Sequence, residues 1–277
     1  MLGVVPNLRL IALDLDGTLL DPNDNISPAN RRAVRAAVEA GVRVVLVTGR
    51  GADTPAEFAR DLGLNLPVIC CHGALTKDFV ANRVLGHIPV PLQYAKPMLD
   101  HAEQNELHVA VYARERFYRL RGTHLYMDDM SGPTWTDVES FTELEGEAPT
   151  FIRFLGKDAV HSVRDVFAGH PVHFKYETWG DFEECAVTSL EATKKNALAR
   201  LCADLNIPAK SVLAVGDSRN DVPMLRWAGI GVAMGNALPE VKQAVHHVTA
   251  PNDADGVALA IEQYVLGTTS FDEEKSA

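Results

Sequence analysis

Residues 10–18 read LIALDLDGT, an almost unbroken apolar run that ends on two aspartates. Such a run is typical of a strand that is buried on both faces of a parallel sheet. Alternate residues of a strand face the same way, so we expect the carboxylates of Asp14 and Asp16 to share one side where the strand ends. Gly17 permits a sharp backbone turn beneath a ligand. Open parallel sheets bind ligands beyond the carboxyl ends of their strands, and the stretch therefore predicts a site there.

Strand and helix signals alternate around this stretch. The pair Ser27 and Pro28 predicts the start of a helix that ends at Gly41. The other predicted strands are residues 42–47, 67–71, 212–215 and 230–233, and the other helices are residues 54–62, 194–205, 221–228, 239–244 and 256–264. This alternation predicts an α/β fold whose core is a doubly wound, Rossmann-like parallel sheet.

A different pattern separates the two halves of that core. Residues 80–188 predict two helices, 91–105 and 159–168, and five strands, 107–112, 116–120, 151–155, 172–176 and 182–187. We interpret this segment as an inserted α+β domain in which a helix and two strands recur. The predicted core then consists of residues 1–79 and 189–277.

Charge restricts the possible partners. The 277 residues suit about two domains of roughly 150 residues each. They include 26 Lys and Arg against 37 Asp and Glu, which gives a formal net charge of −11. Because no basic block offsets this acidity, we expect no nucleic-acid partner. A phosphate site on such a protein would need its own local positive field, best supplied by a divalent cation.

Apolar runs and cysteines indicate the compartment. No apolar run approaches the roughly 20 residues of a membrane helix, and the first residues lack the pattern of a signal peptide. The four cysteines include no Cys-x-x-Cys spacing, and Cys70 and Cys71 are adjacent within an apolar run. Buried, reduced thiols are the simplest interpretation. We therefore expect a cytoplasmic protein that does not associate with membranes.

Two more predicted strands end on polar residues. Residues 48–50, TGR, follow one strand, where the Thr48 hydroxyl is suited either to a phosphate oxygen or to capping the next helix. Residues 216–221, GDSRND, follow another and add two carboxylates and an amide. Carboxylates gathered at one sheet edge repel one another unless a hard cation neutralises them, which predicts a Mg²⁺ site. Lys194, at the start of the preceding helix, offers a further positive charge.

The order and spacing of these motifs resemble the haloacid dehalogenase superfamily, and within it the Cof-type hydrolases with a large C2-type (C2B-like) cap. Residues 14–18, residues 48–50, Lys194 with Ala197 and Leu198, and residues 216–221 match its four motifs in order, with the cap inserted between the second and third. Residues 231–237 and 255–257 match further Cof-type signatures. Lys195 stands where the family usually has glycine, and His72 stands where asparagine usually precedes Gly73.

The resemblance implies roles for the motif residues. Asp14 would attack phosphorus and form an aspartyl-phosphate, while Asp16 would protonate the leaving group and then deprotonate water. Mg²⁺ would be held by Asp14, the Asp16 carbonyl and Asp217. Asp221 would support these ligands without binding the ion directly. The remaining residues implied to bind phosphate or substrate are Thr48, Gly49, Arg50, Lys194 and Asn220. Either Lys194 or Lys195 is a candidate for the phosphate-binding lysine.

These expectations favour a Mg²⁺-dependent phosphatase for small phosphorylated metabolites such as sugar phosphates. A phosphomutase would use the same aspartyl-phosphate, and a non-catalytic regulatory protein could use the same scaffold, although the intact Asp14, Asp16 and Asp217 argue against it. We expect a monomer or a weak homodimer. Outside the motifs, candidate substrate contacts are His72, Arg114, Arg116, Tyr118, Arg121, His124 and Trp135, although residues of these types are more often ordinary surface or packing residues.

Overall fold

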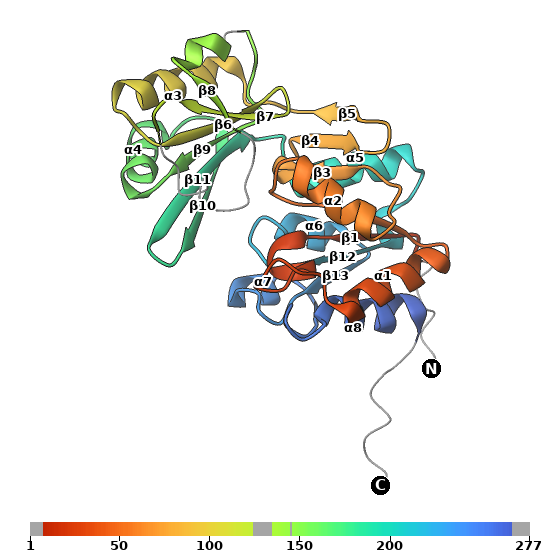
Figure 1. Ribbon diagram of the computed structural model, residues 1–277. Helices are drawn as coiled ribbons and strands as arrows, with labels where there is room; N and C mark the ends of the chain where they lie inside the picture. Colours follow the sequence, from red (N-terminus) through yellow and green to blue (C-terminus); the bar gives the residue numbers. More distant parts are fainter. Residues whose placement is uncertain (1–7, 124–134, 145, 268–277) are drawn as a thin grey trace. The chain divides into compact units, whose positions relative to one another are not determined.

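The computed structural model describes residues 8–123, 135–144 and 146–267 (Figure 1). These residues form two compact units, one made of the chain up to Gly86 together with the chain from Thr193, the other of His87–Ala192. The second unit begins seven residues later and ends four residues later than the predicted insertion of 80–188. Each unit has its own sheet.

Five parallel strands form the central sheet of the first unit, in the order β14-β13-β12-β1-β2. The strands are β1 (Leu10–Leu13), β2 (Arg43–Leu46), β12 (Val212–Gly216), β13 (Ile230–Ala233) and β14 (His247–Val248). Every residue of β1 and β12 is buried, as expected for the centre of a parallel sheet. The α/β Rossmann-like core that the sequence predicts is therefore confirmed.

Helices flank this sheet in pairs. They are α1 (Pro28–Glu39), α2 (Asp53–Asp61), α5 (Lys194–Asp204), α6 (Val222–Trp227), α7 (Pro239–Gln243) and α8 (Gly256–Ile261). Helix α1 packs on α8, and α5 packs on α6 on the other side of the strands (Figure 1). Helix α1 starts where the sequence predicts, because the Ser27 hydroxyl accepts a hydrogen bond from the N–H of Asn30 and Pro28 occupies the first turn.

A small antiparallel sheet extends the first unit. It contains β3 (Val68–Cys70), β4 (Leu75–Asp78) and β5 (Arg83–His87), in that order. A single parallel bridge between Val47 and Ile69 links β3 to the end of β2. Only the first of these strands was predicted, since β4 and β5 are largely polar and carry no sustained apolar alternation.

The second unit is a six-stranded sheet in the order β10-β11-β9-β6-β7-β8. Its strands are β6 (Val109–Ala113), β7 (Arg116–Leu120), β8 (Trp135–Val138), β9 (Phe151–Leu155), β10 (Val172–Trp179) and β11 (Phe182–Ser189), and its helices are α3 (Leu92–Gln104) and α4 (Lys157–Phe167). Strand β8, which was not predicted, runs parallel to β7. The other pairs are antiparallel, so the predicted α+β character is confirmed.

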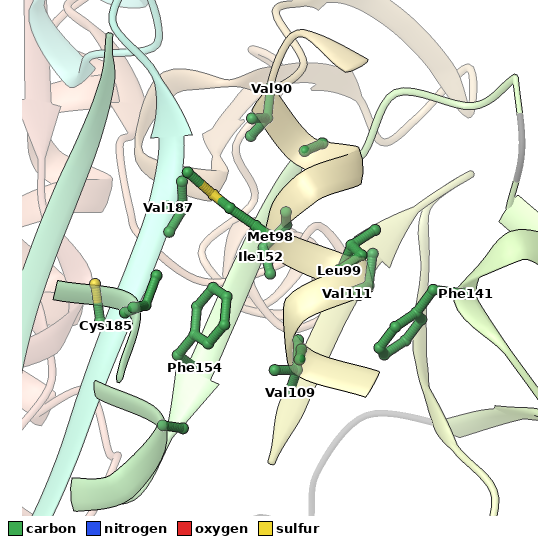
Figure 2. Packing of buried hydrophobic residues seen from close by; sticks show 14 of the residues in the cluster. Val90, Met98, Leu99, Val109, Val111, Phe141, Ile152, Phe154, Cys185 and Val187 are labelled. Carbon is green, nitrogen blue, oxygen red and sulfur yellow. The ribbon is translucent and has the colours of Figure 1, made fainter. Parts of the chain in front are cut away.

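One apolar core holds the second unit together. Met98 and Leu99 of α3 pack against residues from the middle of the sheet, including Ile152 and Phe154 of β9 and Val187 of β11 (Figure 2). All of these side chains are buried. The unit therefore has a hydrophobic core separate from the central parallel sheet, as an independent domain requires.

Among the residues that the structure describes, none of the helices has both the length and the apolar character needed to cross a bilayer.

Candidate active site

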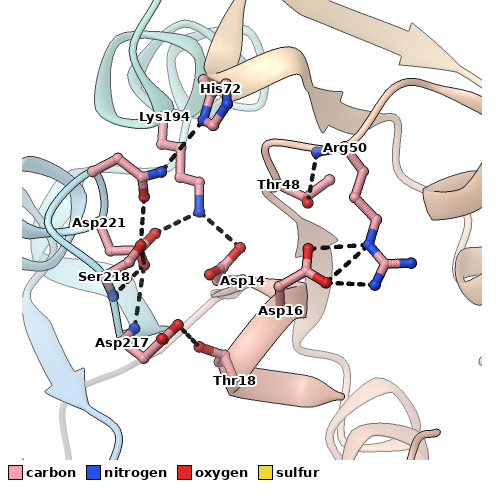
Figure 3. A network of polar contacts seen from close by, with 11 residues as sticks. Asp14, Asp16, Thr18, Thr48, Arg50, His72, Lys194, Asp217, Ser218 and Asp221 are labelled. Atoms are coloured by element: carbon pink, nitrogen blue, oxygen red, sulfur yellow. Dashed lines mark hydrogen bonds and ion pairs between the residues drawn. The ribbon is translucent and has the colours of Figure 1, made fainter. Parts of the chain in front are cut away.

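Three carboxylates meet at the carboxyl edge of the parallel sheet. Asp14 follows β1, and Asp217 and Asp221 follow β12, the strand that pairs with β1 from Leu10↔Val212 to Leu13↔Val215. One oxygen from each carboxylate lies within 4.8 Å of the others (Figure 3). Strand pairing thus gathers residues some 200 positions apart at the edge where the sequence predicts the site.

Lys194 neutralises part of this charge. Its Nζ lies 2.7 Å from Oδ1 of Asp14 and 2.7 Å from Oδ1 of Asp221, and its side chain is only 2% exposed. It is the first residue of α5, whose N-terminus is capped by the Thr193 hydroxyl. The adjacent Lys195 instead points its Nζ to the side-chain oxygen of Asn196, 3.4 Å away. Of the two candidate lysines, Lys194 is therefore the one beside Asp14.

Burial changes the acidity of the cluster. Burial and the Asp221 carboxylate raise the pKa of Asp14 well above its usual range, against the opposing effect of Lys194. The same two causes raise the pKa of Asp217 to about 6. Burial lowers the pKa of Lys194, but the two carboxylates beside it outweigh this effect and raise it overall. Three carboxylates against one ammonium leave two negative charges uncompensated.

The donor set of this cluster fits a hard divalent cation. Mg²⁺ prefers oxygen ligands and is commonly held by one or two carboxylates together with water and phosphate. Asp14 and Asp217 offer such oxygens, and the two uncompensated charges match a divalent ion. Haloacid dehalogenase-type hydrolases use a divalent metal, and this cluster supplies the ligands for one.

Residues 14–18 explain how the first strand supports the cluster. Beyond β1 the chain makes a five-residue turn, Leu15–Leu19, in which Gly17 has a φ of +72°. A Cβ atom on Gly17 would lie 2.5 Å from Oδ2 of Asp217, so any other residue there would displace that carboxylate. The hydroxyl of Thr18 donates a hydrogen bond to Oδ1 of the same aspartate, at 2.9 Å. Thr18 is thus a supporting residue that the motif contains but that sequence reasoning did not single out.

The Asp16 side chain does not follow the predicted alternation along the strand. Because Asp14 already lies beyond the strand and Asp16 lies in the turn, the period of two does not apply to them. The Asp16 side chain is 53% exposed, and its carboxylate binds the guanidinium of Arg50 (Figure 3). The Arg50 side chain, predicted to bind phosphate, therefore has a carboxylate as its partner.

Thr48 lies at the carboxyl edge of the parallel sheet, just beyond β2. It is fully buried, and its hydroxyl accepts a hydrogen bond from the N–H of Arg50 at 3.1 Å. Helix α2 begins only at Asp53, so Thr48 does not cap it, and the alternative interpretation of this residue is wrong. Gly49 packs against the His72 ring, where a Cβ atom would lie 2.4 Å from Cε1.

A hydrogen-bond chain fixes the loop after β12. Oδ2 of Asp221 accepts the N–H groups of Asp217 and Ser218, at 3.2 and 3.0 Å. The Ser218 hydroxyl lies 2.8 Å from Oδ1 of Asn220, whose amide nitrogen lies 3.3 Å from Nδ1 of His72. Asp221 therefore organises the loop that presents Asp217, and His72 orients Asn220. Sequence reasoning did not single out Ser218.

Most of the other candidate substrate contacts interact with neighbouring residues of the protein. Arg114 and Arg121 form ion pairs with Glu147 and Glu139, and Tyr118 is buried in the core of the second unit. Trp135 packs under the guanidinium of Arg119. Arg116 is exposed at the start of β7. His124 lies outside the described residues.

A buried aspartate at the end of the first strand, with a lysine and further carboxylates around it, lies at the sheet edge where the sequence predicts the site. The family model for haloacid dehalogenase-like hydrolases matches residues 11–261. The chain belongs to this family. It is a phosphoric monoester hydrolase.

Similar proteins of known sequence cover almost the whole chain. The pyridoxal phosphate phosphatase YbhA of Escherichia coli (strain K12) is 30% identical over 93% of this chain and 99% of its own length. The 5-amino-6-(5-phospho-D-ribitylamino)uracil phosphatase YcsE of Bacillus subtilis (strain 168) is also 30% identical, over 94% of this chain and 97% of its own. Both are named phosphatases.

Solved structures agree in fold. A haloacid dehalogenase-like hydrolase from B. subtilis is 28% identical, with a TM-score of 0.80 over 93% of this chain and all of that chain. Another, the subclass IIB sugar phosphatase BT4131, shares the fold with a TM-score of 0.77 over 92% of this chain and 98% of that chain, at 22% identity. Both units of the present structure therefore have counterparts in this family.

Proposed function

We propose that this hydrolase is a Mg²⁺-dependent phosphatase that acts on small phosphorylated metabolites, such as sugar phosphates, through an aspartyl-phosphate. The observation that carries the proposal is the environment of Asp14, which lies buried at the end of β1 with the Lys194 ammonium 2.7 Å from its Oδ1. A carboxylate nucleophile divides a difficult hydrolysis into two easier displacements.

Mg²⁺ would be held by Asp14, Asp217 and the backbone carbonyl of Asp16. Asp221 would hold in place the loop that carries Asp217. When bound, the ion neutralises the repulsion between the carboxylates and a phosphate dianion and stabilises charge at the phosphoryl group. Asp221 serves this arrangement through the N–H groups of Asp217 and Ser218, which both donate to its Oδ2.

Each residue of the site has its own part in the two displacements. Asp14 attacks phosphorus, and the leaving alcohol takes a proton from the Asp16 carboxyl group. In the second displacement Asp16 accepts a proton from the attacking water, so that it ends in its starting state. The Thr48 hydroxyl and the Lys194 ammonium bind the transferring phosphoryl oxygens, together with Asn220 and the backbone at Gly49.

Support for a small phosphorylated substrate comes from the relatives. YbhA and YcsE are named for phosphate esters of small molecules, and BT4131 is named a sugar phosphatase. We assign substrate selection to the inserted unit, in keeping with its separate hydrophobic core. The four cysteines are all buried, as expected of reduced thiols, which supports the expected cytoplasmic location. We retain the expectation of a monomer or weak homodimer without a nucleic-acid partner.

The decisive experiment replaces the nucleophile. Asp14→Asn keeps the shape of the side chain but removes its charge, and we expect phosphate release in the presence of Mg²⁺ to fall to the background of the assay. The substrate is the best of a panel of phosphorylated metabolites. Thermal unfolding and circular dichroism of the variant check that it is folded. Activity near that of the unmodified protein would exclude Asp14 as the nucleophile.

A phosphomutase remains the second candidate, because it would use the same aspartyl-phosphate. Phosphorus NMR of the reaction mixture distinguishes the two activities. Free inorganic phosphate as the product supports the phosphatase, whereas an isomeric phosphate ester supports the mutase. Loss of both products in Asp14→Asn would be expected in either case. No phosphate transfer from any member of the panel would favour the non-catalytic alternative.

A further inference from the structure

The guanidinium of Arg50 bridges two carboxylates. Its Nε lies 2.9 and 3.0 Å from the two oxygens of Asp16, and one terminal nitrogen, Nη2, lies 2.5 Å from Oδ1 of the same group (Figure 3). That Nη2 atom also lies 2.6 Å from Oδ1 of Asp24. Arg50 thus links Asp16, the proposed acid and base, to an aspartate that belongs to none of the sequence motifs.

Asp24 is held at the tip of a tight hairpin between the turn after β1 and helix α1. Leu20 and Ile26 pair across the hairpin, and Oδ1 of Asp21 accepts the N–H groups of Asn23 and Asn25, at 2.8 and 2.9 Å. The N–H of Asp24 itself donates to the Asp21 carbonyl at 3.0 Å. Local hydrogen bonds therefore fix the backbone that carries the Asp24 carboxylate.

Asp16 needs such support. Its side chain is 53% exposed and lies in a non-helical turn, so packing alone does not set its orientation. An arginine fork binds both oxygens of a carboxylate and fixes its plane. The arginine side chain is itself long and flexible, and holding it in one rotamer costs conformational entropy. A second carboxylate, that of Asp24, binds the same terminal nitrogen and reduces that freedom.

We infer that Asp24 is a positioning residue for Asp16, acting through Arg50. This inference rests on the proposed function, in which Asp16 protonates the leaving group. Asp24 touches neither the carboxylate cluster nor Asp16 and acts only by holding the guanidinium. General acid catalysis depends on the geometry between the acid and the leaving oxygen. Loss of Asp24 would therefore impair the reaction most where the leaving group needs a proton.

The test uses Asp24→Asn in the full-length protein with Mg²⁺. Asparagine has nearly the same shape, tolerates the left-handed φ of 61° at this position, and removes only the charge. The substrates are a series of substituted phenyl phosphates whose phenol leaving groups range from weakly to strongly acidic. We expect kcat/KM to fall by about tenfold for phenyl phosphate, part of the roughly 10²–10⁴ that general acid–base catalysis contributes. For 4-nitrophenyl phosphate, whose leaving group departs without a proton, we expect less than about a twofold loss.

Matched variants separate positioning from stability. Asp61→Asn removes a comparable ion pair, that of Arg31 with Asp61, away from the site, and we expect it to leave the whole series unchanged. Asp24→Glu should restore part of the loss for phenyl phosphate. In an Arg50→Lys background, which lacks the fork, Asp24→Asn should cause little further change, because both substitutions interrupt one chain of contacts.

Several outcomes would overturn the inference. An equal loss across the series would assign Asp24 to phosphate binding or stability rather than to Asp16. An unchanged series would mean that Arg50 holds Asp16 without help. Either result leaves the proposed function intact provided that Asp14→Asn is inactive in the same assay. If Asp14→Asn stays active, the proposed function itself fails.

Discussion

The Nζ atom of Lys194 lies 2.7 Å from Oδ1 of Asp14, and both side chains are almost completely buried. The pair belongs to the cluster in which the carboxylates of Asp14, Asp217 and Asp221 surround this ammonium. Lys194 therefore stabilises the core, because without its ammonium the carboxylates of Asp14 and Asp221 would be buried without this partner.

Replacing that lysine tests its structural role. Lys194→Met should lower the free energy of unfolding by about 3 kcal/mol near pH 8 without added metal, because it leaves buried carboxylates unpaired. The loss should be smaller at pH 5, below the pKa of about 6 of Asp217, because protonation of that group removes one of the buried negative charges. Urea titrations at both pH values measure the effect. Lys195→Met is the matched control, since the Lys195 ammonium lies 3.4 Å from the neutral side chain of Asn196. Similar losses in both variants would contradict the assignment of Lys194.

The close approach of Gly17 to Asp217 predicts a specific loss of metal binding. Gly17→Ala would place a Cβ atom 2.5 Å from Oδ2 of Asp217 and should displace that carboxylate. Gly63→Ala is the control, because Gly63 has a φ of +71° and a Cβ atom there would meet nothing within 4 Å. Both substitutions should cost about 1 kcal/mol of backbone strain. Only Gly17→Ala should require a more than roughly tenfold higher Mg²⁺ concentration for half-maximal activity, a shift worth about 1.4 kcal/mol of binding free energy.

Protons and metal should compete at the cluster. The pKa of Asp217 rises from a usual 3.8 to about 6 in the folded protein. The folded state consequently binds more protons than the unfolded state between these values, so the metal-free protein loses stability as the pH rises from about 4 to 6. Under the proposed function Mg²⁺ binds the ionised form and should raise the melting temperature more at pH 7.5 than at pH 5. Asp217→Asn should reduce this pH dependence, and the raised pKa of Asp14 accounts for what remains. A Mg²⁺ effect equal at both pH values in the unmodified protein would contradict the prediction.

The inserted unit offers a comparison of a buried and an exposed ion pair. Glu184, on β11, is 3% exposed and binds the guanidinium of Arg153 on the neighbouring strand β9. Arg153→Met leaves that carboxylate buried and should lower the free energy of unfolding by about 3 kcal/mol. Arg121→Met removes the exposed pair with Glu139 and should change it by less than about 1 kcal/mol. Equal effects in urea titrations would show that burial does not decide the contribution of these pairs.

Sequence patterns predicted the parts of this molecule that depend on local chemistry. The Ser27 cap and the apolar run of β1 act within a few residues, and both were correctly placed. The edge of a parallel sheet is also predictable, because parallel strands present their carboxyl ends together, and this brought Asp14 and Asp217 to one site.

The unpredicted parts depend on contacts between distant segments. Strand β8 is a four-residue strand that pairs in parallel with β7, and so short a stretch does not establish an alternating pattern. The direction of the Asp16 side chain follows from the turn after β1 and from Arg50, 34 positions away. The orientation of Asn220 follows from His72, 148 positions away. No pattern read along the chain contains such pairings.

The position of β1 between β2 and β12 has a consequence for how the enzyme is made. Asp14 and β1 are synthesised about 200 residues before the strand that completes their neighbourhood, as the hydrogen bond between Thr18 and Asp217 across 199 positions illustrates. Pairings of such high contact order form slowly, and an unpaired apolar strand is prone to aggregate while it waits. The inserted unit is synthesised in that interval and folds around a core of its own. We therefore expect a stage during synthesis in which the insert is folded while β1 is not yet paired with β12. A chaperone that shields the unpaired strand from aggregation would act at this stage.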